Sequence, residues 1–251
     1  MGEFSSFDGT TIVYDDLGEG PPVVMLHGFA ADARANWHQP KVVEAVVAAG
    51  RRVITPDARG HGRSGKPHDI AAYQGQAMPR DVTALLDHLD LDQVDVVGYS
   101  MGARITAQVA LSEERVRSIV LGGVGAGVIQ GRGPAGAEAI AAALTAPDKS
   151  AIADAAARGF RAFAESTGAD REALAAVMRA GMGQPPQSLG SLSMPALVIC
   201  GDKDVLVGPP QALVDAIPGA ELVIVNGDHL TAVGDPKFRH AIADFLTRVA
   251  R

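Results

Sequence analysis

The sequence has almost no cysteine. Cys200 is the single cysteine among 251 residues, which excludes an internal disulfide. No spacing of cysteine and histidine residues is typical of a zinc site, so we expect no metal. Cys200 ends the apolar run Ala196–Ile199, and we expect it to be a small buried hydrophobic residue.

Basic residues and long apolar runs are also scarce. The chain has 22 Lys and Arg against 29 Asp and Glu, a net charge of −7, which argues against a nucleic-acid-binding surface. No uninterrupted apolar stretch is long enough to cross a membrane. Residues 1–6 lack the basic-then-apolar pattern of a secretion signal. We therefore expect a cytoplasmic protein, monomeric or homodimeric, with neither a nucleic acid nor a membrane as partner.

What the sequence does contain is typical of a globular protein. Hydrophobic residues make up 47% of the chain and charged residues 20%. At this length the chain fits one large α/β domain, or such a domain with an inserted lid.

Residues 94–110 carry the pattern around which the chain is organised. Val94–Val97 suit a buried strand and Ala103–Ala110 a helix, with Gly-x-Ser-x-Gly between them. In this context the serine, Ser100, occupies a strained turn that holds its hydroxyl clear of the sheet. The two glycines are needed because any side chain there would collide with a neighbouring element. The pattern predicts that Ser100 is a nucleophile, with a helix N-terminus facing any anion beside it.

Strands and helices alternate along most of the chain. We expect strands at residues 4–7, 11–14, 23–26, 52–56, 94–97, 116–121, 196–200 and 221–225, and helices at 37–49, 78–91, 103–110, 210–217 and 238–249. The first two strands form a hairpin, and the later alternation predicts a mostly parallel, doubly wound sheet. Ligands of such sheets bind at the carboxyl ends of the strands, where Ser100 lies.

The alternation of strand and helix patterns stops after the sixth predicted strand. Residues 123–193 are rich in alanine and show no strand pattern. Helical spacing occurs at residues 137–144, 149–166 and 170–180. We expect residues 123–193 to form a small helical cap, inserted into a core of residues 1–122 and 194–251. Three further packing helices of the main domain are the alternative, but the strand pattern resumes directly afterwards and favours a cap.

A serine hydroxyl needs a base, usually a histidine that a carboxylate orients. His229 follows the last predicted strand and is the predicted base. Asp202 and Asp204 follow the strand before it, so the chain order is Ser, Asp, His. One of the two aspartates is expected to orient the His229 ring, and the other to cap the turn.

These motifs together resemble the α/β-hydrolase superfamily, in particular its capped, esterase- and lipase-like branch near the cofactor-free haloperoxidases and C–C hydrolases. The resemblance covers nearly the whole chain. It rests on His27-Gly28-Phe29, Asp57–Ser64, Gly98–Gly102, Gly201–Asp204 and Asp228-His229.

The resemblance implies an α/β-hydrolase fold and specific roles for site residues. Asp204 would be the acid of a triad with Ser100 and His229, and the backbone N–H groups of Phe29 and Met101 would form an oxyanion hole. The chain departs from the family in having Asp228 before the histidine instead of glycine. This extra carboxylate could raise the pKa of His229 or give it a second partner. A second departure, Ala103 where the family often has a second glycine, leaves the nucleophile assignment intact.

The implied reaction is hydrolysis of an ester-like small molecule through an acyl-enzyme, which requires no metal or organic cofactor. Candidate pocket residues are Trp37, Phe160, Phe163, Met178 and Met182, although Trp37 is equally suited to anchoring its helix in the core. A largely apolar pocket would suit esters with small or medium acyl chains. The alternatives are a C–C hydrolase or perhydrolase on the same fold, or a hydrolase-like ligand-binding protein with weak turnover.

Overall fold

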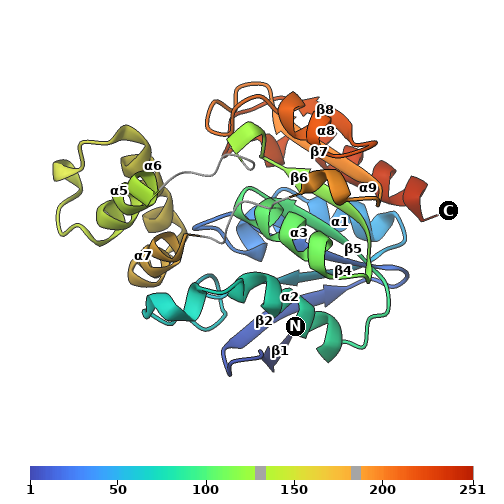
Figure 1. Ribbon diagram of the computed structural model, residues 1–251, viewed down its shortest axis with the longest axis horizontal. Coiled ribbons are helices and arrows are strands. Elements are labelled where there is room, and N and C mark those ends of the chain that lie inside the picture. Colours follow the sequence, from blue (N-terminus) through green and yellow to red (C-terminus); the bar gives the residue numbers. More distant parts are fainter. Residues whose placement is uncertain (128–133, 182–187, 251) are drawn as a thin grey trace.

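One sheet forms the centre of the molecule (Figure 1). The computed structural model describes residues 1–127, 134–181 and 188–250, and in these ranges eight strands form the sheet. The strands are β1 (Gly2–Ser5), β2 (Thr11–Leu17), β3 (Pro22–Leu26), β4 (Arg52–Pro56), β5 (Val94–Tyr99), β6 (Val116–Gly122), β7 (Ala196–Gly201) and β8 (Glu221–Val225). Their order is β1-β2-β4-β3-β5-β6-β7-β8, antiparallel for β1–β2 and β2–β4 and parallel elsewhere. The predicted α/β class and mostly parallel sheet are confirmed.

Helices cover both faces of the sheet. The helices α1 (Val42–Ala48) and α9 (Pro236–Val249) pack on one face, and α2 (Ala77–His88), α3 (Met101–Ser112) and α8 (Gln211–Ala216) on the other. Short helical turns are η1 (Arg34–His38), η2 (Ile70–Tyr73), η3 (Lys149–Ala151), η4 (Leu189–Ser191) and η5 (Ala232–Gly234). No helix in the described ranges has an apolar stretch that would reach across a bilayer.

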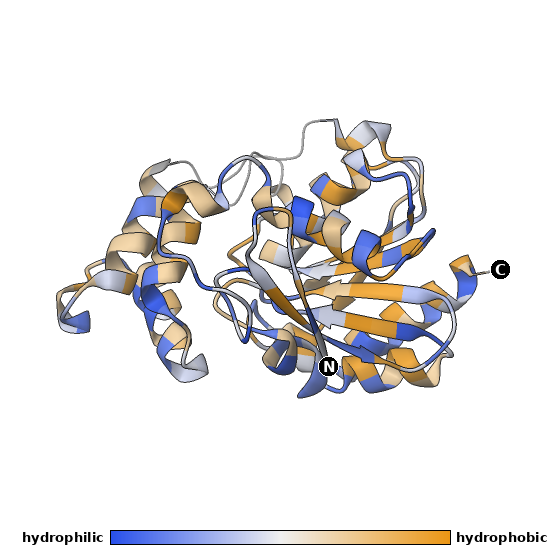
Figure 2. Ribbon diagram, turned by 90° about the horizontal axis from the view of Figure 1, so that it is seen from below, coloured by the Kyte–Doolittle hydropathy of each residue, from blue (hydrophilic) through white to orange (hydrophobic). Residues whose placement is uncertain are grey.

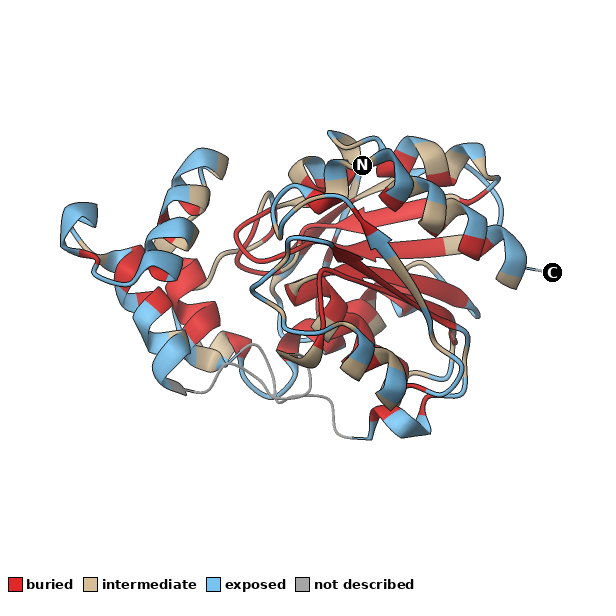
Figure 3. Cartoon of the chain, turned by 90° about the horizontal axis from the view of Figure 1, so that it is seen from above, coloured by how far each residue is buried: buried red, intermediate tan, exposed pale blue. Residues whose placement is uncertain are grey.

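Both faces of the central strands are buried. On β5, Val94 and Val96 join the core under α2 and α3, whereas Val97 and Tyr99 join the core under α1 and α9. Figure 2 shows apolar residues along these strands, and Figure 3 shows the same strands as buried. This double burial explains why the strand sequence is continuously apolar instead of alternating.

The prediction of one continuous helix over residues 37–49 is wrong. The structure has η1, then a break, then α1. Pro40 lies in the break and has no N–H to donate, and Lys41 follows it with a φ of 62°. A proline inside an apolar helical pattern, here Pro40, was the signal in the sequence that the helix ends there.

The described residues between β6 and β7 include the helices α5 (Pro134–Thr145), α6 (Ala155–Thr167) and α7 (Arg171–Ala180). We call them the helical insert, and they lie together at one end of the molecule, away from most of the sheet (Figure 1). The predicted helix at 149–166 is instead two, η3 and α6, because the Asp154 carboxylate accepts from the Ala157 N–H and starts a new helix. The insert occurs where the cap was expected, and its standing as a separate cap stays a prediction.

Candidate active site

Ser100 lies in the tight turn between β5 and α3. Its φ is 54° and its ψ −109°, a conformation that is unfavourable for a residue with a side chain. The turn is possible because its neighbours are glycines: a Cβ on Gly98 would overlap the carbonyl oxygen of Gly102, and one on Gly102 would overlap that of Leu26. The Ser100 N–H donates to the carbonyl of Gly122 at 2.8 Å, which fixes the turn to β6. The steric need for both glycines is as predicted.

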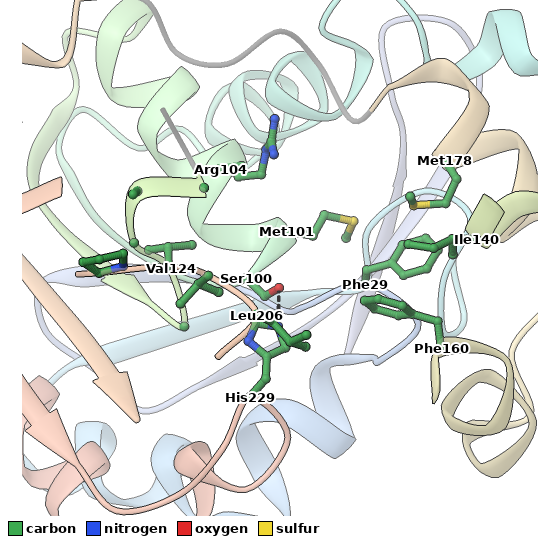
Figure 4. A pocket seen from close by; sticks show the side chains of 17 residues that line it. Phe29, Ser100, Met101, Arg104, Val124, Ile140, Phe160, Met178, Leu206 and His229 are labelled. Atoms are coloured by element: carbon green, nitrogen blue, oxygen red, sulfur yellow. Dashed lines mark hydrogen bonds between the residues drawn. The ribbon is translucent and has the colours of Figure 1, made fainter. Parts of the chain in front are cut away.

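Three side chains from separate loops meet beside this turn. His229 Nε2 lies 2.8 Å from Ser100 Oγ, and His229 Nδ1 lies 2.7 Å from Asp204 Oδ2 (Figure 4 shows the first bond). The Asp204 side chain is fully buried, and its other oxygen accepts the N–H of Leu206 at 3.1 Å. Because an ionised carboxylate can only accept, Nδ1 carries the ring proton and Nε2 is free to accept the serine proton. The arrangement can therefore deprotonate the Ser100 hydroxyl.

Of the two other nearby aspartates, Asp202 joins two loops instead of capping its own turn, and Asp228 holds a turn. Asp202 accepts the N–H of Gly227 at 2.9 Å, joining the loops that follow β7 and β8. Asp228 accepts the N–H and the hydroxyl of Thr231, at 3.0 and 2.7 Å, and these bonds lower the pKa of the Asp228 carboxyl. Of the three aspartates, Asp204 is the one that bonds to the His229 ring in the structure.

The predicted oxyanion donors flank Ser100. Met101 is the first residue of α3, and Phe29 follows Gly28 in the loop after β3. A Cβ on Gly28 would lie 3.6 Å from the Cβ of Ser100, so this loop passes directly beside the serine. The Gly28 N–H donates to Asn36 Oδ1 at 2.8 Å, which ties the loop to η1.

His27 and His61 lie behind this loop, fully buried, with ring centroids 5.2 Å apart. His27 Nε2 accepts the N–H of Ala58 at 3.0 Å, so its Nδ1 carries the proton and donates to the carbonyl of Gly28 at 2.8 Å. Burial lowers the pKa of His27 and lowers that of His61 to about 3. Both rings are therefore neutral, and their hydrogen bonds hold the loops that carry them.

Two cavities adjoin the serine. One, of 360 Å³, is bounded by the helical insert, the start of α3 and two loops at 123–127 and 206–209. The other, of 290 Å³, extends toward η1 and the end of α6. Both are lined by Ser100, His229, Phe29 and Phe160. The rings of Phe29 and Phe160 lie side by side next to Ser100 (Figure 4).

The comparisons with known proteins agree with this architecture. A family model described as alpha/beta hydrolase fold matches residues 21–134. The enol-lactonase from Burkholderia xenovorans LB400 superposes with a TM-score of 0.79 at 25% identity, over 98% of this chain and 100% of its own. The chain therefore has the α/β-hydrolase fold.

Curated proteins that match part of this chain have different activities. The 2-hydroxy-6-oxo-2,4-heptadienoate hydrolase from Pseudomonas putida is 40% identical over 111 residues, which are 43% of this chain and 39% of that protein. The non-heme chloroperoxidase CPO-A1 from Kitasatospora aureofaciens is 43% identical over 95 residues, 38% of this chain and 33% of that protein. The match thus spans about two fifths or less of the length of these relatives.

Of the candidate pocket residues, Trp37 takes the alternative that the sequence left open, a position in the core. Trp37 does not line either cavity: it is fully buried in the core with α1 and α9, because η1 turns it toward the sheet. Phe160 and Met178 line the larger cavity and Phe163 the smaller one, whereas Met182 lies outside the described residues.

Arg104 was missed by the sequence analysis. Its N–H donates to the Ser100 carbonyl at 3.2 Å, so it lies one helical turn beyond the serine, and its side chain lines the larger cavity (Figure 4). The spacing of four residues from Ser100 was the available signal. Within the described ranges, no three histidine, cysteine or acidic side chains cluster as metal ligands would.

Proposed function

We propose that this protein is a serine hydrolase that cleaves carboxylic esters with small or medium acyl groups. The observation that carries the proposal is the continuous hydrogen-bonded chain from Ser100 Oγ through the His229 ring to the buried Asp204 carboxylate, beside a cavity. Geometry of this kind activates a serine hydroxyl, which is a weak nucleophile on its own.

In the proposed mechanism, Ser100 attacks the ester carbonyl while His229 Nε2 takes the hydroxyl proton. The backbone N–H groups of Phe29 and Met101 donate to the oxyanion, and each such donor contributes about 10²–10³ in rate. The His229 imidazolium then protonates the leaving alcohol. A water molecule, deprotonated by His229, cleaves the acyl-enzyme and releases the acid.

The size and lining of the cavities support small or medium substrates. Volumes of 360 and 290 Å³ lie at the lower end of the range for ligand pockets. Ile140, Phe160 and Met178 of the insert give the larger cavity an apolar wall, and Arg104 is the one permanently charged residue among its described lining. We expect one cavity to take the acyl chain and the other the leaving group.

A C–C hydrolase is the second candidate, because the relative from Pseudomonas putida is a 2-hydroxy-6-oxo-2,4-heptadienoate hydrolase. The loop Phe29-Ala30-Ala31 beside Ser100 offers only apolar side chains, whereas C–C hydrolases usually carry more polar groups there. We therefore rank ester hydrolysis first. Perhydrolysis uses the same acyl-enzyme with hydrogen peroxide in place of water.

The first experiment measures the intact mass after brief exposure to a fluorophosphonate probe. We expect one probe per wild-type chain, no labelling of Ser100→Ala or His229→Ala, and full labelling of Ser112→Ala, which changes a serine at the opposite end of the same helix. Absence of labelling in folded wild type would contradict the proposal and favour a ligand-binding protein.

The second experiment compares substrates. Neutral aryl esters from acetate to octanoate are paired with esters of the same length that end in a carboxylate, and a vinylogous diketone and a peroxide assay test the other two chemistries. We expect the neutral esters of short and medium chains to have the highest kcat/KM. A preference for the carboxylate series would instead refute the apolar pocket and point to Arg104; a higher kcat/KM for the diketone would make the protein a C–C hydrolase.

A further inference from the structure

The helical insert touches the loop beside Ser100 through a hydrogen bond. Thr167, the last residue of α6, donates from its hydroxyl to the carbonyl of Ala30 at 2.8 Å. The same hydroxyl lies 3.1 Å from the carbonyl of Ala164 and 3.3 Å from that of Phe163, both in its own helix. A hydroxyl has one proton, and the shortest of the three contacts is the one to the loop.

The loop needs such support because its conformation is unfavourable. Ala30 has a φ of 60°, in the left-handed region that residues with a side chain rarely occupy. Conformations of this kind persist where surrounding contacts hold them. A second contact comes from the same helix: the ring of Phe160 packs edge-on against that of Phe29, with centroids 5.8 Å apart and planes at 68°.

The Thr167 bond continues through two peptide groups toward Ser100. In the Ala30–Ala31 peptide, the carbonyl accepts from Thr167 and the N–H of Ala31 donates to the carbonyl of Gly28 at 3.3 Å. That carbonyl, which also accepts from His27 Nδ1 at 2.8 Å, belongs to the Gly28–Phe29 peptide, whose N–H is the proposed oxyanion donor. Because a trans peptide is planar and its C=O and N–H point in opposite directions, fixing the carbonyl of Gly28 fixes the direction of the Phe29 N–H.

We propose that Thr167 is a positioning residue for the hydrolytic reaction: it holds the loop so that the Phe29 N–H meets the oxyanion. The inference rests on the proposed function. The hydroxyl acts in the transition state more than in substrate binding, since the negative charge on the oxygen develops only as Ser100 attacks. Consecutive hydrogen bonds along the two peptides also polarise one another and strengthen the final donor.

The test compares variants with and without the hydroxyl. Thr167→Val and Thr167→Ala remove it, and Thr167→Ser keeps it. Thr145→Val is the matched control, because Thr145 likewise ends a helix of the insert and bonds back to its own helix, at 3.2 Å from the carbonyl of Ala141. All variants are assayed for kcat and KM with a short neutral ester, for the rate of fluorophosphonate labelling, and for thermal unfolding.

We expect the hydroxyl-free variants to lose about 5- to 20-fold in kcat and in labelling rate, a fraction of what deleting an oxyanion donor costs, with KM within about twofold. Thr167→Ser and Thr145→Val should stay within about twofold of wild type. Two hydroxyl-free variants are used so that poor folding of one leaves the other to decide.

Other outcomes overturn the inference. An unchanged kcat in folded Thr167→Val and Thr167→Ala, a rise in KM alone, or an equal loss in Thr167→Ser would each assign Thr167 a merely structural role. Failure of the proposed function is distinguishable from these results, because wild type itself would then show neither ester turnover nor labelling of Ser100.

Discussion

Asp204→Asn removes one charge from the site and keeps the shape of the side chain. The direction of the new amide is determined by its surroundings. Asp204 Oδ1 accepts the N–H of Leu206, so the amide oxygen of asparagine takes this place and the amide NH₂ faces His229 Nδ1. The side chain is fully buried, which leaves no alternative partner in water.

An NH₂ group that faces Nδ1 selects the wrong tautomer of His229. Nδ1 must then accept, so the ring proton moves to Nε2, which lies 2.8 Å from Ser100 Oγ and can no longer take the hydroxyl proton. The neutral amide also stabilises the imidazolium less than the carboxylate does. The corresponding substitution in another serine hydrolase lowers kcat by about 10⁴, which is about 5.4 kcal/mol in the activation barrier. We expect a loss of this size.

Asp228→Asn is the matched variant, because it removes a carboxylate next to the same histidine. Its oxygen accepts hydrogen bonds within a turn, and an amide oxygen can accept them too. We expect its kcat to stay within about threefold of wild type. The assay is steady-state hydrolysis of an aryl acetate, with thermal unfolding as the control for folding. The reasoning is refuted if Asp228→Asn loses as much as Asp204→Asn, or if Asp204→Asn keeps more than about a tenth of the wild-type kcat.

Two further predictions concern stability. Gly102→Ala places a methyl group against the backbone carbonyl of Leu26, which cannot move aside as a flexible side chain would, so we expect the free energy of unfolding to fall by more than about 2 kcal/mol; an unchanged midpoint of urea unfolding would contradict this. The hydrogen bond of His68 to Asp170, at the start of α7, raises the pKa of His68 above 6.5. A raised folded-state pKa gives stability below about pH 6.5 that is lost as the pH rises through the folded pKa. The melting temperature of wild type should therefore exceed that of His68→Gln at about pH 5.5 and converge with it by about pH 8.5; a pH-independent difference would rule out the ion pair as the cause.

The sequence was most informative where a short segment is compatible with only one local structure. Gly98, Ser100 and Gly102 predict a turn, and the structure shows why each glycine is needed. The apolar strands predict a sheet that is buried on both faces, as Val94–Val97 illustrate. These inferences need only the steric limits of the backbone and the side-chain period of a strand.

Tertiary contacts decided what the sequence left open. Asp202 and Asp204 lie two residues apart in one loop, and no local rule says which carboxylate reaches His229. Arg104 reads as an ordinary residue of a helix until the folded chain places the cavity beside it. The continuous helix predicted over residues 37–49 is wrong for a different reason, since Pro40 was visible in the sequence and was not used to end the helix.

Ser100 and Ala30 are both strained, but different contacts stabilise the two residues. Both have a positive φ and neither is glycine. The turn at Ser100 is accommodated by its own glycines, within β5 and α3. Gly28, two residues before Ala30, has room for a Cβ without severe overlap, and Ala30 is held from outside, by Thr167 of the helical insert.

Different parts of the protein therefore position the nucleophile and the proposed oxyanion donor. The core supplies the first, and the insert contributes to the second. It follows from the proposed role of Thr167 that changes in α6 alter kcat even for acetate esters, whose acyl group is too small to fill the cavity beside the insert. A lid that only selects substrates by size would affect long acyl chains and leave acetate unchanged, so the chain-length dependence of α6 variants separates the two roles of the insert.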